Sequence, residues 1–445
     1  MRTGVVLVVL LCLLAAGCGG GSSSSEGTTS TSAAGGPTGA GQTLVIMGFG
    51  TGDEIATTRT ALARKAVAPA KVHNPNGAFN DQQFLTAVAS GAIPDLIYLD
   101  RQKVGTYAAK GALQPVDVCG IDMSQFRTPA VDEVTFDGKP YGMPEFYDNR
   151  TLIVNDSVTK KAGVTDLSTT DWAKLKADAR KLTARSGGKL TRIGFDPKLP
   201  EFFPLWAKAN GVDLVSKDGQ TAHLDDPKAI EALKYAVSLI NEQGGWGKFK
   251  SFRDTWDFFG GKNEFARDQV GAFPMEDWYY NVLAENSPQV KITAEPFTDR
   301  QGNPIDWVTG SAWAIPKGAK HVQLACEWAK TMTEKSSWIA AAKVRLAQTR
   351  AKGLAFTGLY TANKAADDEI MNKLWKPTGT VFDQAVRTVM KVQDDGFALP
   401  ASPGGAAVTQ AWTNAVNRVL AAQQSPAAAL RQAQREAQSA IDAAS

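Results

Sequence analysis

The pattern that most constrains this chain is an alternation of short apolar runs with helical segments. TLVIMGF (43–49) and PDLIYLD (94–100) have the composition of buried strands, and residues 54–67 have a helical pattern. Strands that alternate with helices favour an α/β fold with mostly parallel sheets. In such sheets, ligands bind beyond the carboxyl ends of the strands.

The length of the chain predicts more than one domain. Its 445 residues exceed what a single hydrophobic core usually supports, so we expect two domains. Apolar residues make up 43% of the chain and charged residues 21%, which is typical of a soluble globular protein. A net charge of +3 gives no electrostatic reason to expect a nucleic-acid partner.

The N-terminus resembles an export signal. The apolar run 5–16 is shorter than the roughly 20 residues that span a bilayer, and it fits the core of a signal peptide. Small residues then lead to Cys18, as in the lipobox of bacterial lipoproteins. We therefore expect a signal peptide (1–17), lipidation at Cys18 and a disordered tether (18–41), so that the protein is extracytoplasmic and anchored to the cell membrane. The alternative is an ordinary cleaved signal with an incidental cysteine.

Cysteine and histidine usage does not indicate a metal site. His73, His223 and His321 share no metal-ligand spacing, so we expect neither a metal nor a cofactor. Cys119 and Cys326 could pair in an oxidising compartment, but the sequence does not show whether they come close enough.

Several stretches, in order, resemble the extracellular solute-binding proteins of ABC importers, in the large maltose-binding-like family (family 1). They are SGAIPDLIYLDRQKVGTYAAKGALQPVD, DGKPYGMPEFYDNRTLIVN, TDWAKLKADARKLT, FARDQVGAFPMEDWYYN, GSAWAIPKGAKHVQLACEWAKTM and SPAAALRQAQREAQ. Val154 and Met47 depart from the residues common in the family, so the resemblance does not identify the sugar.

The resemblance implies a two-lobe, periplasmic-binding-protein-like fold (type II). It places lobe 1 at 42–148 and 297–332, and lobe 2 at 149–296 and 333–445. The chain would cross between the lobes near 147–152, 292–297 and 331–335. Family members close over a small-molecule solute and deliver it to membrane permease subunits, and we expect this protein to be a monomer. Closure requires that the solute contact the closed form better than the open form.

The stretch EDWYYN contains the best candidate for a ligand contact. Sugars have apolar faces that stack on aromatic rings, and hydroxyl rims that carboxylates bind. Trp278 is the expected stacking residue, and Glu276 and Tyr279 are expected beside it. A charged pair next to aromatic residues is costly to bury unpaired, which argues against a purely structural role.

Further candidates follow from strand ends and from the resemblance. Asp148, with Tyr147 beside it, lies where the family uses an acid at the first crossing, although a salt bridge with Arg150 is an alternative. Asp53 also fits a helix N-cap. The remaining candidates are Phe49, Asp100, Arg101, Glu201, Trp206, Gly310 and Ser311.

The expected function is carbohydrate binding for import, without enzymatic activity. No nucleophile elbow or phosphate-binding loop is present in the sequence. One alternative is a non-sugar solute such as a glycerophosphodiester, which would need free cations such as Arg101, Arg150 or Arg345. A glycoside hydrolase would need paired carboxylates, for which Glu201 and Glu276 are conceivable. A cell-surface adhesion protein is a third alternative.

Overall fold

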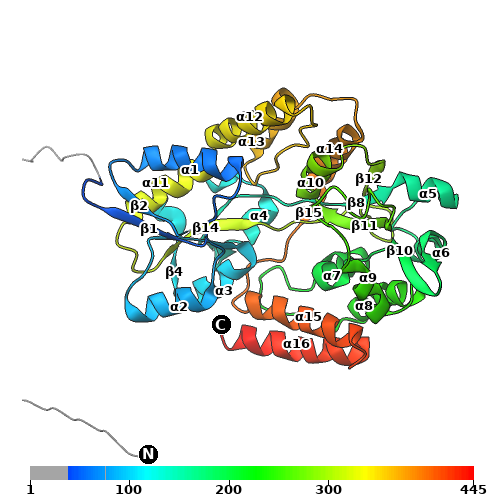
Figure 1. Cartoon of the computed structure of the whole chain (residues 1–445). Helices are drawn as coiled ribbons and strands as arrows, with labels where there is room; N and C mark the ends of the chain where they lie inside the picture. Colours follow the sequence, from blue (N-terminus) through cyan, green and yellow to red (C-terminus); the bar gives the residue numbers. More distant parts are fainter. Residues whose placement is uncertain (1–38, 76, 445) are drawn as a thin grey trace, which may run out of the picture. The chain divides into compact units, whose positions relative to one another are not determined.

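The structure is a computed structural model that describes residues 39–75 and 77–444. The predicted signal peptide, the lipidation site Cys18 and nearly all of the predicted tether lie outside the described residues. Within the described part, two larger β-sheets are each covered by helices and belong to one compact unit (Figure 1). No helix in this part is long and apolar enough to cross a membrane.

The first sheet has the strand order β2-β1-β3-β14-β4, and β7 also pairs with β14. Its strands are β1 (Thr43–Met47), β2 (Lys71–His73), β3 (Leu96–Asp100), β4 (Leu113–Gln114), β7 (Met143–Pro144) and β14 (Ser311–Pro316). β1 is parallel to β2 and β3, whereas β14 is antiparallel to β3, β4 and β7. The chain reaches β14 from the second sheet and not through a crossover helix, which explains the reversed direction.

Apolar residues on both faces of the first sheet form its core. Leu44 and Ile46 pack with α1 (Glu54–Ala66) and α11 (Val322–Thr333). Ile97 and Leu99 pack with α2 (Asp81–Ser90) and α3 (Val104–Ala109). This two-sided burial explains why the strands read as continuous apolar runs.

The second sheet has the order β12-β8-β11-β10-β9. Its strands are β8 (Arg150–Asn155), β9 (Ala184–Ser186), β10 (Lys189–Phe195), β11 (Val270–Glu276) and β12 (Ile292–Pro296). Among them, only β10 and β11 pair in parallel. The predicted α/β architecture is confirmed, but the prediction of mostly parallel sheets is wrong. Hairpins and segments that cross between the sheets supply several strands, and these arrive antiparallel.

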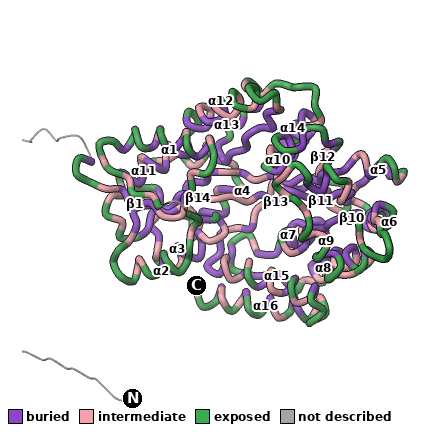
Figure 2. The backbone as a smooth tube through the Cα atoms, viewed as in Figure 1, coloured by how far each residue is buried: buried purple, intermediate pink, exposed green. Residues whose placement is uncertain are grey.

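Most of the other helices after β8 cover the second sheet, but α12 (Lys335–Ala351) packs mainly against α1, and α13 (Lys364–Glu369) packs against α12. In Figure 2, buried residues predominate in the strands, and the exposed residues lie mostly on the outer helices and loops. The remaining helices of this group are α5 (Asp156–Ala162), α6 (Trp172–Leu182), α7 (Leu199–Ala209), α8 (Pro227–Glu242), α9 (Trp246–Arg253), α10 (Trp278–Asn286), α14 (Val381–Val392), α15 (Gly405–Leu420) and α16 (Pro426–Asp442).

Two segments connect the sheets and lie side by side. Residues 145–149 lead from β7 to β8, and residues 297–310 lead from β12 to β14. The Asp148 N–H donates to the Thr309 carbonyl at 3.0 Å, and the two residues form an isolated β-bridge. The first of these segments, 145–149, is called the crossing segment below.

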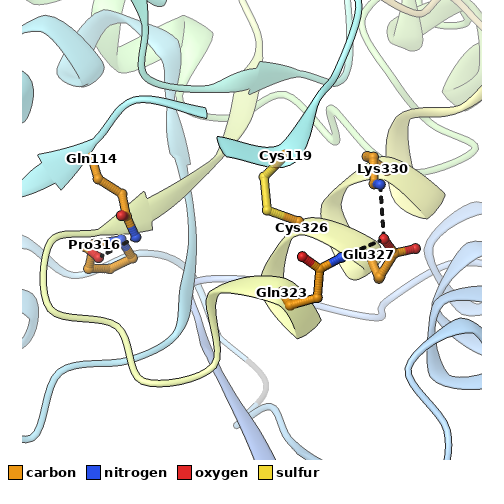
Figure 3. The surroundings of a disulfide bond; sticks show 7 residues. All are labelled: Gln114, Cys119, Pro316, Gln323, Cys326, Glu327 and Lys330. Carbon is orange, nitrogen blue, oxygen red and sulfur yellow. Dashed lines mark hydrogen bonds and ion pairs between the residues drawn. A yellow bond between two sulfur atoms is a disulfide. The ribbon is translucent and has the colours of Figure 1, made fainter. Parts of the chain in front are cut away.

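A disulfide joins Cys119 to Cys326, which answers the question that the sequence left open. Cys119 ends the short helix η2 (Val116–Cys119) and Cys326 lies in α11 (Figure 3). Their Cα atoms are 5.2 Å apart although 207 positions separate them in the sequence. The bond therefore ties two distant parts of the chain together within the first half of the fold.

Candidate functional site

The crossing segment presents different side chains to its two sides. It is extended and carries β-bridges at Phe146 and Asp148. Successive side chains of an extended chain point to opposite sides. Tyr147 lines a cavity of about 1640 Å³, so Asp148 points away from that cavity.

On the Asp148 side, Arg150 organises a chain of polar contacts. Its Nη2 donates to Glu276 Oε1 at 2.7 Å and to Thr309 Oγ1 at 3.0 Å. The other oxygen of Glu276 accepts from the indole N–H of Trp278 at 2.8 Å. Glu276 ends β11 and Trp278 begins α10, so a single strand-to-helix turn positions both side chains. Arg150 therefore pairs with Glu276, and not with the Asp148 carboxylate.

The Asp148 carboxylate differs from these paired groups. Among the described residues, no donor hydrogen-bonds to its carboxylate oxygens and no cation forms an ion pair with it. Burial, followed by the nearby negative charge of Glu276, raises the pKa of Asp148 to about 7, although Arg150 and Arg101 oppose the shift. The residue as a whole is only partly buried. A partly accessible acceptor without a protein donor is available to a ligand hydroxyl.

The ring of Trp278, which donates to Glu276, and the ring of Phe259 are exposed. Phe259 is 66% exposed and Trp278 is 36% exposed. Their ring planes lie within 12° of each other, with centroids 6.1 Å apart. Together they form an aromatic platform, here defined as the Trp278 and Phe259 rings. Large exposed aromatic surface is unusual on a monomer and typically marks a binding site.

The structure buries several of the residues predicted from sequence, each with a structural partner. Trp206 is 0% exposed, and its indole N–H donates to the Pro197 carbonyl at 2.8 Å. The Tyr279 hydroxyl donates to Glu264 at 2.6 Å. Phe49 packs between the Tyr98 and Trp313 rings. None of these three side chains offers a free surface to a ligand, because core packing takes up their faces.

Arg101 and Gly310 hold the crossing segment in place. Arg101 is fully buried, and its Nε donates to Glu133 at 2.6 Å while its Nη1 donates to the Phe146 carbonyl. Gly310 has a left-handed φ of 152°, and a Cβ there would collide with the Phe146 carbonyl and the Arg101 guanidinium. Only glycine fits this close backbone approach.

The remaining candidates lie nearer the surface. Asp53 caps α1, since it accepts from the Ala56 N–H at 2.7 Å, and it also pairs with Arg345 at 3.1 Å. Glu201 pairs with Arg253. Asp100 is exposed at the end of β3, opposite Ser311 at the start of β14.

The cavity on the Tyr147 side has a different character. Its lining includes Arg127, Phe136, Asp137 and Phe397, and Tyr147 is the one sequence-predicted site residue among the residues that line it. Arg127 lies over the Tyr147 ring at 5.3 Å and pairs with Asp367 and Asp394. The cavity is therefore roomy, and its arginine is already paired, whereas Lys217 and Lys364 also line it.

Sequence reasoning missed Arg150 as the organiser of the site and Phe259 as half of the platform. The stretch WDFFGG (256–261) contained a signal for Phe259, because adjacent aromatic residues before two glycines indicate a loop that exposes a ring. The sequence offered Arg150 only as a salt-bridge partner of Asp148 or as a free cation for a phosphate. Its actual partner, Glu276, lies 126 positions away, and no local pattern reports that contact.

Two α/β halves joined by paired crossing segments, with an unpartnered carboxylate and an exposed aromatic pair nearby, define a solute-binding protein. The model of the family described as "Bacterial extracellular solute-binding protein" matches residues 76–376, which is more than half of the chain. The chain belongs to this family, whose members are substrate-binding proteins and not enzymes.

Known proteins resemble the chain over part or most of its length. The maltodextrin-binding protein of Bacillus subtilis is 25% identical over 54% of this chain, and the arabinooligosaccharide-binding protein of the same organism is 22% identical over 57%. These alignments cover 56% and 59% of those relatives, and a match to a Brucella abortus binding protein covers 51% of it. The chain thus spans little more than half of the curated relatives that it matches.

Solved structures share the fold across nearly the whole chain. The structure of CpMnBP1 with mannobiose bound has a TM-score of 0.72, is 23% identical, and aligns over 89% of this chain and 100% of its own. A maltotriose-bound maltose/maltodextrin-binding domain from Bdellovibrio bacteriovorus has a TM-score of 0.66 and is 19% identical over 90% of this chain and 100% of its own. At these identities the likeness establishes the fold.

Proposed function

We propose that the protein is the substrate-binding component of an ABC importer and that it captures a mono- or oligosaccharide between its two α/β halves. The observation that carries the proposal is the Asp148 carboxylate, which has no partner among the described residues. It lies on the side of the crossing segment where Glu276 accepts hydrogen bonds from both Arg150 and Trp278 of the aromatic platform. A sugar needs both a ring to stack on and acceptors for its hydroxyls. The names of the maltodextrin- and arabinooligosaccharide-binding relatives support the same class of ligand.

The proposed contacts form two groups. Asp148, Glu276 and Trp278 make the central contacts, together with Phe259. Asp53, Asp100, Glu201, Gly310 and Ser311 lie at the ends of strands or helices and are proposed as peripheral contacts. Phe49, Arg101, Tyr147, Trp206 and Tyr279 are proposed to support the site through packing, because they are buried in this structure.

A phosphodiester ligand is disfavoured by the pairing of the arginines. Arg101 pairs with Glu133, Arg150 with Glu276, and Arg345 with Asp53 and Glu54. These were the cations that the sequence left open for a phosphate. Glu201 and Glu276, the pair conceivable for a hydrolase, are each engaged by an arginine as well.

The proposal includes the location and the partners of the protein. A lipid on Cys18 would anchor the folded body to the cell membrane, where permease transmembrane subunits would receive the sugar. The protein would act as a monomer. The lobe boundaries at 148/149, 296/297 and 332/333 are part of the same proposal, with closure around the sugar as the working motion.

A thermal-shift and calorimetry screen of the purified protein tests this proposal. Maltotriose, mannobiose and arabino-oligosaccharides would be compared with glycerophosphodiesters and oligopeptides. A ligand at 100 times its Kd should stabilise the fold by about 2.7 kcal/mol. Stabilisation by a sugar is the expected result. Stabilisation by a phosphodiester or a peptide alone would overturn the carbohydrate proposal.

A further inference from the structure

Lys198 adopts an unusual backbone conformation at the edge of the second sheet. It follows β10 and immediately precedes α7, with a φ of 49°. Left-handed φ values are costly for residues other than glycine, and they cluster at functional sites. The residue is also only 5% exposed, which is rare for a lysine.

The ammonium group of Lys198 lies against aromatic rings and not against polar groups of the described residues. Its Nζ lies 4.8 Å from the centroid of the Phe258 ring and 4.7 Å from that of Phe273. Within residues 39–75 and 77–444, this Nζ makes no hydrogen bond and no ion pair. The two aromatic faces offset part of the desolvation, but a buried ammonium still lacks hydrogen-bond acceptors.

The nearby carboxylates are occupied by other groups. Asp196 pairs with Arg253 at 3.1 Å, and Glu201 pairs with the same arginine. Glu264 accepts from the Tyr279 hydroxyl at 2.6 Å. Burial, together with the charge of Arg253, lowers the pKa of Lys198. Three acids and one other base surround this ammonium, so the environment is not positive overall.

A single ring separates Lys198 from the aromatic platform. The ammonium lies over the Phe258 ring, which packs edge-on against two other rings. Its centroid is 5.1 Å from that of Phe259 and 6.4 Å from that of Trp278. The ammonium and the platform therefore belong to one aromatic cluster. The cluster combines an exposed stacking surface with a hydrogen-bond donor that lacks an acceptor.

We propose that Lys198 is a ligand contact that determines specificity, and that its ammonium donates a hydrogen bond to a hydroxyl oxygen of the sugar unit stacked on Trp278 and Phe259. This inference rests on the proposed function. The ligand group is a neutral hydroxyl and not a carboxylate or phosphate, because the surrounding acids would repel an anion. The unpaired amine is retained at a cost to stability because the ligand supplies its acceptor.

The test compares Lys198→Met and Lys198→Gly with the wild type by calorimetry against maltotriose and mannobiose. Methionine keeps the apolar stem and removes the charge, and glycine removes the backbone strain. Both variants should bind the sugar at least tenfold more weakly. Their melting temperatures should equal or exceed that of the wild type, because the unpaired charge or the strain is gone. Lys208→Met in α7, which breaks an exposed pair with Asp213, is the matched control and should leave the affinity within twofold.

The outcomes separate this inference from the proposed function. If the wild type binds neither these sugars nor any other sugar of the screen, the proposed function fails and this inference fails with it. If the wild type binds and both variants bind within twofold, only the role of Lys198 is overturned. Lower melting temperatures in both variants would indicate a structural role and would also overturn it. Monodeoxy analogues of the bound sugar add a sharper criterion, since one of them should lose affinity for the wild type but not for Lys198→Met.

Discussion

The two sides of the crossing segment differ in what they leave unsatisfied. The Tyr147 side has the large cavity, but its arginine is paired with Asp367 and Asp394. The Asp148 side combines a carboxylate without a partner with Glu276 and the aromatic platform. The volume of a cavity shows only that a ligand would have room there. Unpartnered polar groups and exposed rings report where the protein has contacts left to make, and we place the sugar there.

Removal of the platform's indole should give the largest effect. Trp278→Ala deletes a stacking surface and the N–H that holds Glu276, so sugar affinity should fall at least tenfold, or about 1.4 kcal/mol. Calorimetry measures this change. Phe136→Ala, which removes a ring from the cavity side, is the matched control and should change affinity less than twofold. The reverse ranking of these two variants would move the site to the cavity.

Substitution of Asp148 should give the second-largest loss of sugar affinity. Asp148→Asn removes the charge of the proposed acceptor, so affinity at pH 8 should fall about tenfold, in the range of a hydrogen bond to a charged group. The fold should not lose stability, because a buried charge beside Glu276 is removed. Asp137→Asn makes the same chemical change on the cavity side and should leave binding intact. Equal losses in the two variants would contradict the distinction between the sides.

The pH dependence of binding should follow the same carboxylate. With its pKa raised to about 7, Asp148 is ionised at pH 8 and largely protonated at pH 6. Affinity should therefore fall several-fold from pH 8 to pH 6 in the wild type and stay flat in Asp148→Asn.

Stability should change in the opposite direction. Between the unfolded pKa of about 3.9 and the folded pKa, the folded state holds a proton that the unfolded state has lost. The free energy of unfolding should therefore decrease as pH rises through this window, and Asp148→Asn should reduce the slope. Denaturant titrations at pH 4, 5.5 and 7 measure it. A slope unchanged by the substitution would show that Asp148 does not titrate in this range.

The smallest effect is expected on the other side of the same segment. Tyr147→Phe removes a buried hydroxyl that has no hydrogen-bond partner among the described residues. Sugar affinity should stay within twofold of the wild type, and the melting temperature should not fall. Measured beside Asp148→Asn, this variant compares neighbouring residues whose side chains point to opposite sides of the crossing segment. A large loss of affinity would show that the cavity side takes part in binding.

The sequence predicted the fold class more completely than the site. The apolar runs at 43–49 and 94–100 located strands, and the N-cap alternative for Asp53 was correct. These runs did not predict whether the strands pair in parallel or antiparallel, because a buried strand has the same apolar composition in both arrangements. The resemblance pointed to Trp278, and the structure leaves that ring exposed.

Long-range pairing limited the prediction of the site. Nothing local distinguishes Trp206, which is buried, from Trp278, since both stand in aromatic-rich stretches. Arg101 read as a free cation because its partner, Glu133, lies 32 positions away in the chain. Whether a polar group is satisfied depends on such contacts, and they become visible only after folding.

The bond between Cys119 and Cys326 has a practical consequence. It joins η2 to α11 beside the first sheet, although both crossing segments lie between the two cysteines in the sequence. Its loss would therefore loosen the packing of η2 against α11. Glutathione and thioredoxin keep thiols reduced in a typical cytosol. Protein purified from the cytosol would therefore carry two free thiols in place of the disulfide. Binding constants should be measured on oxidised protein.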